Sequence, residues 1–372
     1  MVGGLHVFGR DKSKREVREK GGLGPARIIR RFFGVLLTVV LGLVIALVGV
    51  VFLLCKGPSQ AARDLTVTTF LESGSLKFVP HVFLSNEEIS EIVNKTAMQS
   101  MDTSVLDASL VDASQTGEEA AALDMNAIEI KEILGRTYYA KLMIVNDPSR
   151  VKIGGSVPFG DSWNLDEIVT GNGCVAGVNG GLYANITGTG GAPRGVVVKD
   201  HEILCMDIYD EEGLFLIGFD DTNLLQIIDI HEMGEEEIRA TVADRHIRDA
   251  ICFQDEASDA NNHFVPLVIN GVPRELGGLG SGANPRTVVG QRADGAVLLL
   301  VTDGRGASGH LGATASDLIN IMVENGAVNA ANLDGGSSSS MWYDGKYEMT
   351  SVTLMYANGS WLMPTAVVVE AR

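Results

Sequence analysis

The feature that most constrains this chain is a run of 23 residues without a charge, from Phe32 to Leu54. A helix of this length is long enough to cross the hydrocarbon core of a bilayer. Nine Lys and Arg residues precede the run, whereas only Lys56 and Arg63 follow it closely. This distribution of positive charge predicts that residues 1–31 form a basic cytoplasmic tail and that the chain after the run lies outside the cell.

A cleaved signal peptide is the alternative interpretation of the same run. The run is too long for the apolar part of a signal peptide, and no small-x-small motif directly follows it. Cys55 would suit a lipoprotein, but Leu54 stands before it where a small residue is usual. We therefore expect a signal anchor that spans the cell membrane once, through residues 32–54.

The remainder of the chain has the opposite charge balance. The formal net charge of −18 divides into +7 for residues 1–56 and −25 for residues 57–372. So acidic a region is a poor partner for nucleic acid or for an anionic surface. An anionic ligand would bind only through locally placed arginines and backbone N–H groups. The four cysteines include no CxxC pair and allow one disulfide at most in the exported part.

Two regions follow the apolar run. Residues 55–127 are polar and are predicted to form an extracellular stalk with one helix at about 85–98, where Ser85 and Glu88 have the spacing of a capping box. From residue 128 to residue 372, short β-like runs alternate with turn residues, and helices are rare. The predicted fold class is α+β, with a mixed, largely antiparallel sheet and a few covering helices.

Three polar residues are expected at one edge of this sheet. Residues 286–303 are predicted to form a hairpin, which places Arg286 and Asp303 at the same end of neighbouring strands. A helix at 315–324 and a further strand lead to Asp334. Such a passage commonly brings like strand ends together, so Asp303 and Asp334 should emerge side by side with Arg286 between or beside them.

A glycine-rich loop, 277–285, precedes Arg286, and others follow Asp303, Asp334 and the strand that ends at Asn179. Loops of this kind let backbone N–H groups and a ligand approach each other closely, and strand ends that open into them are common places for sites. We take Asp334, Asp303 and Arg286 as candidate catalytic residues. The candidate substrate-binding residues are Asn179, Gly180, Gly181, Arg194, Arg305, Gly335, Gly336 and Ser337.

Carboxylates, arginines and glycine-lined loops together suit an anionic ester of a sugar. An ordinary glycosidase needs a general acid because an alkoxide is a poor leaving group. A phosphate leaving group is a weaker base, and arginines that neutralise it are more useful. No GxxxxGK[ST] motif occurs, "GASGH" is not a GxSxG elbow, and the serines 337–340 have no evident histidine partner. His310 is expected to be structural.

No zinc-like or other metal motif is present, and the reaction class needs no cofactor. Clustered Asp303 and Asp334 could instead hold Ca²⁺ or Mg²⁺, because carboxylate oxygens are the ligands that these hard cations prefer. The sequence leaves both roles open, and it says nothing about the oligomeric state.

Four segments, in this order, resemble the phosphodiester glycosidase family. They are "GVNGGLY…GAPRGVVV", "NPRTVVGQRADGAVLLLVTDGR", "NLDGGSSSSMWYDGK" and the closing "PTAVVVEA". The resemblance covers about residues 128–370, and bacterial members of this family are often described as exopolysaccharide-related. The segment "TTFLESGSLKFVPHVFLSNEEI" is similar to the leader of membrane-anchored bacterial members.

The resemblance implies hydrolysis of a sugar-1-phosphodiester, which releases the sugar and leaves a phosphomonoester on the other partner. Asn179, Arg286, Asp303 and Asp334 are the polar residues of the shared motifs. Our hypothesis is that Asp334 is the nucleophile or base at the anomeric carbon and that Arg286 is a phosphate clamp. Asp303 would orient Arg286 or a sugar hydroxyl. The substrate would be a cell-envelope glycan or a related diester. The alternative is a catalytically inactive glycan-binding protein, or one that assembles exopolysaccharide or teichoic acid.

Overall fold

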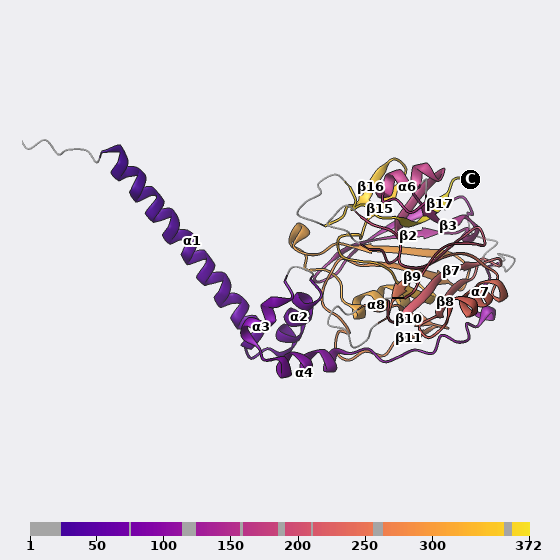
Figure 1. Cartoon of the computed structure of the whole chain (residues 1–372), viewed down its shortest axis with the longest axis horizontal. Coiled ribbons are helices and arrows are strands. Elements are labelled where there is room, and N and C mark those ends of the chain that lie inside the picture. Colours follow the sequence, from indigo (N-terminus) through magenta and orange to yellow (C-terminus); the bar gives the residue numbers. More distant parts are fainter. Residues whose placement is uncertain are drawn as a thin grey trace, which may run out of the picture. The chain divides into compact units, whose positions relative to one another are not determined.

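The computed structural model describes residues 24–73, 76–113, 124–156, 159–184, 190–209, 211–255, 263–352 and 359–372. Most of the predicted basic tail, residues 1–23, lies outside this described part. The chain divides into two units, residues 1–53 and 54–372, and the second of these is compact (Figure 1).

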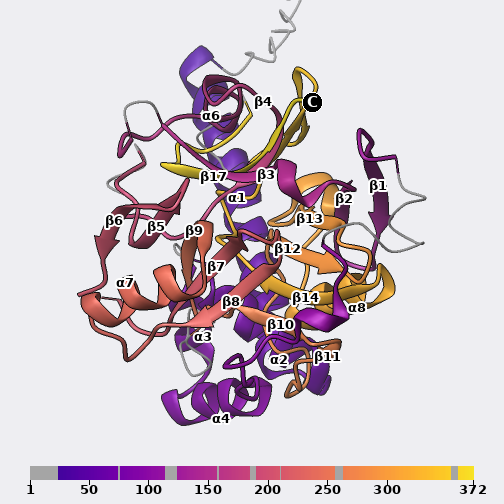
Figure 2. The same cartoon turned by 90° about the vertical axis from the view of Figure 1, so that its right-hand side faces the viewer.

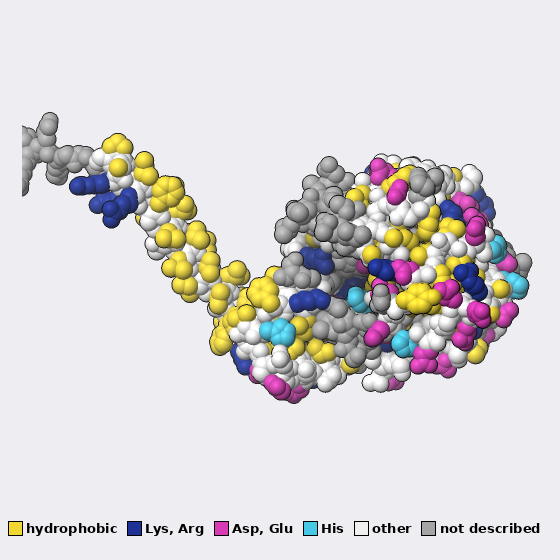
Figure 3. All heavy atoms as spheres, in the orientation of Figure 1, with side chains coloured by type: hydrophobic (Ala, Val, Ile, Leu, Met, Phe, Trp, Pro, Cys, Tyr) yellow, Lys and Arg dark blue, Asp and Glu magenta, His cyan; other side chains and the backbone are white. Residues whose placement is uncertain are grey.

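The apolar run lies in helix α1 (Pro25–Lys56), which is long and apolar enough to cross a membrane by length and composition. Its side chains are almost all exposed in the absence of a bilayer. Figure 3 shows basic side chains at the start of this helix and apolar side chains along the rest of it. The predicted apolar helix is therefore present.

The compact unit contains three antiparallel sheets rather than one. The first has seven strands in the order β1-β2-β13-β12-β14-β10-β11, and the second and third have five strands each, in the orders β16-β15-β4-β17-β3 and β6-β5-β9-β7-β8. All pairs of these strands that hydrogen-bond to each other are antiparallel in the described part of the chain. The predicted α+β class with a largely antiparallel arrangement is confirmed.

The strand bounds, sheet by sheet, are as follows. The first sheet contains β1 (Ile128–Leu134), β2 (Tyr139–Val145), β13 (Val297–Thr302), β12 (Thr287–Arg292), β14 (Ala327–Asn332), β10 (Pro266–Ile269) and β11 (Val272–Pro273). The second contains β16 (Lys346–Met349), β15 (Met341–Tyr343), β4 (Cys174–Asn179), β17 (Thr365–Glu370) and β3 (Val151–Gly155). The third contains β6 (Glu202–Asp207), β5 (Gly195–Lys199), β9 (Ile247–Gln254), β7 (Leu214–Asp220) and β8 (Leu225–Asp229).

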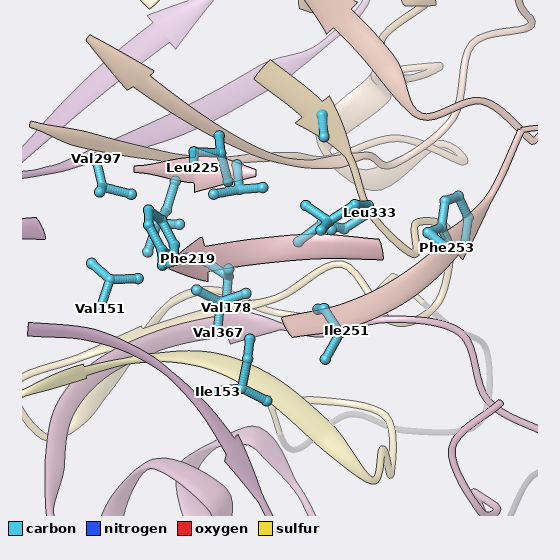
Figure 4. Packing of buried hydrophobic residues seen from close by; sticks show 14 of the residues in the cluster. Val151, Ile153, Val178, Phe219, Leu225, Ile251, Phe253, Val297, Leu333 and Val367 are labelled. Carbon is cyan, nitrogen blue, oxygen red and sulfur yellow. The ribbon is translucent and has the colours of Figure 1, made fainter. Parts of the chain in front are cut away.

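The inner strands of each sheet are buried on both faces, whereas the edge strands are partly exposed. Side chains that alternate along the strands point inward to one shared core, which includes Val178, Ile217 and Val289 (Figure 4 shows part of this core). On the other face, each sheet is covered by one helix: α8 (Ala315–Glu324) on the first, α6 (Leu165–Gly171) on the second and α7 (Glu235–Asp244) on the third. Figure 2 shows these three helices around the sheets.

Local signals placed several elements correctly. Thr314 caps α8 in a capping box with Asp317, and Gly326 follows the helix with a φ of +80°. The predicted hairpin between β12 and β13 forms, with Thr287 opposite Val301.

The predicted stalk contains more structure than its sequence indicated. The predicted helix is present as α4 (Asn86–Thr96), with the capping box of Ser85 and Glu88. Two further helices, α2 (Gln60–Leu71) and α3 (Phe78–Phe83), contact it. Short 3₁₀ turns lie at Ala108–Leu110, Pro148–Arg150 and Ala307–Gly309. Residues 60–96 belong to the same compact unit as the sheets.

Candidate active site

The central core fixes where Asp334 lies. Strand β14 ends at Asn332, and the next residue, Leu333, is completely buried in the core that all three sheets share (Figure 4). The backbone N–H of Leu333 donates to the carbonyl of Thr287 at 2.8 Å, which extends the pairing of β14 with β12 by one residue. The chain therefore enters the loop at Asp334 from a rigid strand end.

Asn179, at the end of β4, supports this loop through hydrogen bonds. Its Nδ2 donates to the backbone carbonyl of Asp334 at 2.6 Å. Its Oδ1 accepts from Thr287 Oγ1 at 2.7 Å and from the backbone N–H of Ser340 at 3.2 Å. The residue is 1% exposed. Asn179 was predicted to bind substrate; in the structure it ties three strand ends together, and it is not among the described residues that line the cavity above the loop.

A cavity of about 390 Å³ opens over this loop. Six of the predicted site residues line it: Arg286, Arg305, Asp334, Gly335, Gly336 and Ser337. The sequence did not point to several others that also line it, among them Glu72, Tyr183, His263, Asn284, Ser338 and Trp361. Two carboxylates, those of Glu72 and Asp334, and two arginines thus line one cavity. The hypothesis of an anionic sugar ester requires a carboxylate and arginines in one site.

The Asp334 carboxyl group has an unusual environment. Burial raises its pKa from 3.8 to about 6, although hydrogen bonds from Ser338 and from the Gly335 backbone, together with the charge of Arg305, act in the opposite direction. The Ser338 hydroxyl also lies 3.1 Å from the hydroxyl of Tyr183. Desolvation and nearby Asp334 raise the pKa of Tyr183, which keeps this phenol protonated. The Asp334 carboxyl group therefore changes its charge near pH 6 and is mostly ionised at pH 7, and the hydroxyl that donates to it, that of Ser338, also contacts Tyr183.

The two arginines differ in how firmly they are held. Arg286 is 8% exposed, its guanidinium lies over the ring of Phe264 at 5.0 Å, and its Nη2 has several protein acceptors. Arg305 is exposed, and its Nη1 donates to Ser337 Oγ at 2.8 Å. One guanidinium is thus embedded in the wall, and the other is held at the rim by a hydrogen bond to Ser337.

Asp303 reaches the predicted edge but turns away from the cavity. Strands β13 and β14 both pair antiparallel with β12 and so run parallel to each other, which places Asp303 and Asp334 at like strand ends. The Asp303 carboxylate accepts from the backbone N–H of Tyr139 at 2.7 Å and lies 2.6 Å from His310 Nδ1. It is not among the described residues that line the cavity. The expected pairing of the two carboxylates in one site is therefore not found, and His310 pairs with Asp303.

Three further candidates have structural partners elsewhere. A Cβ on Gly180 would lie 2.6 Å from the carbonyl oxygen of Thr365, and a Cβ on Gly181 would lie 2.4 Å from that of Cys252. These glycines let neighbouring strands approach each other. Arg194 pairs with Asp207 at 2.6 Å and is not among the described residues that line the cavity.

The two glycines after Asp334 are needed for reasons inside the protein as well. A Cβ on Gly335 would lie 2.9 Å from the carbonyl oxygen of Pro285. Gly336 has a φ of +60°, and a Cβ there would lie 2.6 Å from Arg305 Nη2. Glycine at these positions therefore allows the loop to pass close to β12 and leaves Arg305 its place beside the cavity.

The chain can now be compared with known proteins. Residues 172–370 match the model of the phosphodiester glycosidase family. The chain belongs to this family. The matched region includes the loops of Arg286, Arg305 and Asp334, so the cavity lies within the family's shared part, whereas Glu72 lies outside it.

Individual relatives are distant from this chain. A 64-residue stretch is 41% identical to the SPbeta prophage-derived uncharacterized protein YomE of Bacillus subtilis (strain 168), which covers 17% of this chain and 10% of that protein. The catalytic domain of zebrafish N-acetylglucosamine-1-phosphodiester alpha-N-acetylglucosaminidase, auto-inhibited by its pro-peptide, is 16% identical with a TM-score of 0.47, over 66% of this chain and 83% of that one. A hypothetical protein from Synechocystis is 14% identical with a TM-score of 0.45, over 66% and 62% of the two chains.

Proposed function

We propose that this protein is a membrane-anchored hydrolase that cleaves sugar-1-phosphodiesters of a cell-envelope glycan or a related substrate. The observation that carries the proposal is the cavity in which the Asp334 carboxyl group, with a pKa of about 6, lies with Arg286 and Arg305. A carboxylate suits the electrophilic anomeric carbon, and two arginines suit a phosphate group. Membership of the phosphodiester glycosidase family supports the same pairing of sugar and phosphate.

In the proposed reaction the bond between the anomeric carbon and the phosphate oxygen breaks, and water supplies the new hydroxyl of the sugar. Asp334 acts in its ionised form, either as the nucleophile at the anomeric carbon or as the base that activates water. Arg286 and Arg305 neutralise the departing phosphomonoester, so that protonation of the leaving oxygen matters less than in an ordinary glycosidase. Tyr183 and Ser338 donate hydrogen bonds near the Asp334 carboxylate and keep it in place.

Asp303 acts at a distance in this scheme. Its carboxylate and His310 close the loop that follows β13, and Arg305 belongs to that loop. Asp303 therefore positions the loop of Arg305 and does not touch the substrate. The scheme requires no metal or other cofactor.

The anchor places this chemistry at the cell surface. Helix α1 crosses the cell membrane once, with the basic N-terminus in the cytoplasm and residues 57–372 outside. Its apolar length and the nine Lys and Arg residues before it support this orientation. Membrane glycans and wall polymers with sugar-1-phosphodiester links are then within reach.

The test uses the full chain in detergent micelles with a methyl mannoside that carries N-acetylglucosamine-α-1-phosphate as a diester. Free sugar and new phosphomonoester are measured together. We expect both products in equal amounts from the wild type and from Asp344→Asn, a matched change at an exposed aspartate. We expect neither product from Asp334→Asn.

Other outcomes would count against this proposal. Product formation that persists in Asp334→Asn would remove Asp334 from the mechanism. Binding of a panel of sugar diesters without any product from the wild type would favour the alternative, a glycan-binding or assembly protein of the same family.

A further inference from the structure

Glu72, which follows α2, reaches the candidate active site from outside the sheets. Its side chain is only 3% exposed. One carboxylate oxygen lies 2.5 Å from Arg286 Nη2 and accepts from Asn284 Nδ2 at 2.9 Å. The other accepts from the backbone N–H of Gly282 at 2.5 Å. A charged donor and two neutral donors thus converge on one buried carboxylate, which is a complete site for this group.

Backbone contacts between α2 and the loop at 277–282 also hold Glu72 in this position. Thr69 Oγ1 accepts from the backbone N–H of Ala283 at 3.0 Å, one turn before Glu72. A Cβ on Gly282 would lie 2.5 Å from the backbone nitrogen of Thr69, so only glycine lets the loop meet α2 this closely. Similarly, a Cβ on Gly277 would lie 2.3 Å from the carbonyl oxygen of Lys95. The sequence suggested the glycine-rich loop at 277–282 as a ligand loop. In the structure this loop packs against α2 and α4, the helices that precede the sheets in the chain.

The side of Arg286 that faces Glu72 lies inside the protein wall. Besides Glu72, Arg286 Nη2 donates to Ser281 Oγ at 3.3 Å and to the carbonyl of Gly282 at 3.1 Å, and Ser281 is 1% exposed. The Nε atom of Arg286 is buried and has no hydrogen-bond partner among the described residues. The protein thus supplies several acceptors to Nη2, while the Arg286 side chain also lines the cavity.

We propose that Glu72 is a positioning residue for Arg286, so that the segment after the membrane anchor forms part of the active site. Glu72 fixes Nη2 and with it the orientation of the guanidinium, so that Arg286 is already in place at the cavity wall when the substrate phosphate enters. An arginine fixed in advance loses little conformational entropy when the anion binds. This inference rests on the proposed function, because that function assigns the phosphate to Arg286.

The opposite role for the same contact makes a different prediction. If the Glu72 carboxylate occupied the place of the substrate phosphate, it would compete with anions, and its withdrawal would strengthen their binding. Glu72→Asp separates the two roles, because it keeps the negative charge but shortens the side chain by one methylene. The shorter carboxylate can no longer make all three contacts, whereas the electrostatic potential at the cavity changes little.

The experiment measures binding of inorganic phosphate to the full chain in detergent micelles by calorimetry. We expect Glu72→Asp to weaken phosphate binding by about tenfold. The matched variant Glu91→Asp, on the exposed face of α4, should bind as the wild type does. In an Arg286→Gln background, Glu72→Asp should have no further effect, because positioning acts through Arg286. Thermal unfolding of each variant shows whether it folds. If Glu72→Asp does not fold, Glu72→Gln takes its place in the same binding measurement.

Each result bears on the inference separately from the proposed function. Tighter phosphate binding by Glu72→Asp, or binding equal to that of the wild type, would overturn the positioning role. So would a wild type that binds no phosphate at millimolar concentrations. Hydrolysis of the diester by the wild type tests the proposed function in a parallel assay. On that diester, Glu72→Asp should lower kcat by about 100-fold, the cost of a misplaced group, and an increase in kcat would contradict the inference.

Discussion

At the residue scale, Asp334 combines two opposing demands. The chain buries a carboxyl group in a cavity wall and thereby raises its pKa to about 6. It also surrounds the group with Ser338, the Gly335 backbone and Arg305, all of which favour the ionised form. Asn179 holds the backbone at the same residue. Burial by itself would favour the neutral form of Asp334. The hydrogen bonds and the positive charge around the group offset part of that effect and keep the ionised form accessible near neutral pH.

The pH dependence of the reaction follows from this pKa. Because the proposed mechanism uses ionised Asp334, kcat/KM for the diester should rise as the pH increases through about 6 and should level off above it. A pH–rate profile between pH 4 and 9 measures this. A rate that instead falls above pH 6 would mean that Asp334 acts as an acid.

Stability should also depend on the protonation of Asp334. Its pKa in the folded protein is raised from 3.8 to about 6, so the stabilisation by the protonated form is complete below pH 3.8 and is lost as the pH rises through 6. At about 1.4 kcal/mol per pKa unit, the ionised group costs at most about 3 kcal/mol at pH 8. Asp334→Asn should therefore be more stable than the wild type at pH 8, with little difference near pH 4.

Chemical denaturation at the two pH values measures this difference. Asp344→Asn, at an exposed position, should show no such pH dependence. An Asp334→Asn variant that is less stable than the wild type at pH 8 would show that the ionised carboxylate is stabilised by its donors, and that its pKa is not raised.

At the element scale, α2 and the loop at 277–282 depend on each other. Gly282→Ala would place a methyl group 2.5 Å from the backbone nitrogen of Thr69, so α2 must move away and carry Glu72 with it. We expect a loss of about 1–3 kcal/mol in stability, together with weaker phosphate binding. Gly234→Ala, at the N-cap of α7 with nothing within 4 Å of the added Cβ, should cost up to about 1 kcal/mol and leave phosphate binding unchanged.

Denaturant unfolding and phosphate calorimetry of the two variants test this interdependence. Normal phosphate binding in a destabilised Gly282→Ala protein would mean that α2 supports the fold but not the site. The result would separate the docking of the helix from the positioning of Arg286.

At the scale of the whole molecule, the exported part carries 25 more negative than positive residues, yet its cavity contains two arginines. The long-range field repels an anionic polymer, and the arginines attract its phosphate only at short range. For a polymeric phosphodiester substrate, kcat/KM should therefore rise severalfold as salt increases from low to physiological concentration. An uncharged glycoside should show no such rise, and a fall with salt for the polymer would mean that a basic surface outside the cavity captures it.

The local elements could largely be predicted from the sequence. The apolar length of α1, the caps of α4 and α8 and the turn between β12 and β13 depend on residues a few positions apart. The position of Arg286, Asp303 and Asp334 at one sheet edge followed from the connection between two parallel strands. These features were predictable because backbone conformation and strand direction depend mainly on neighbouring residues and on chain connectivity.

Side-chain direction and distant partners were decided only by the tertiary structure. Asp303 lies at the predicted sheet edge, but its carboxylate contacts Tyr139 and His310. Asn179, expected to bind substrate, donates a hydrogen bond to the backbone of the Asp334 loop. Glu72 meets Arg286 from 214 residues away, and no spacing in the sequence indicates that contact. The sequence by itself determined which residues end the strands, because hydrophobic alternation and glycine turns are local. Only the packing of three sheets and three preceding helices determined which of those residues share a cavity.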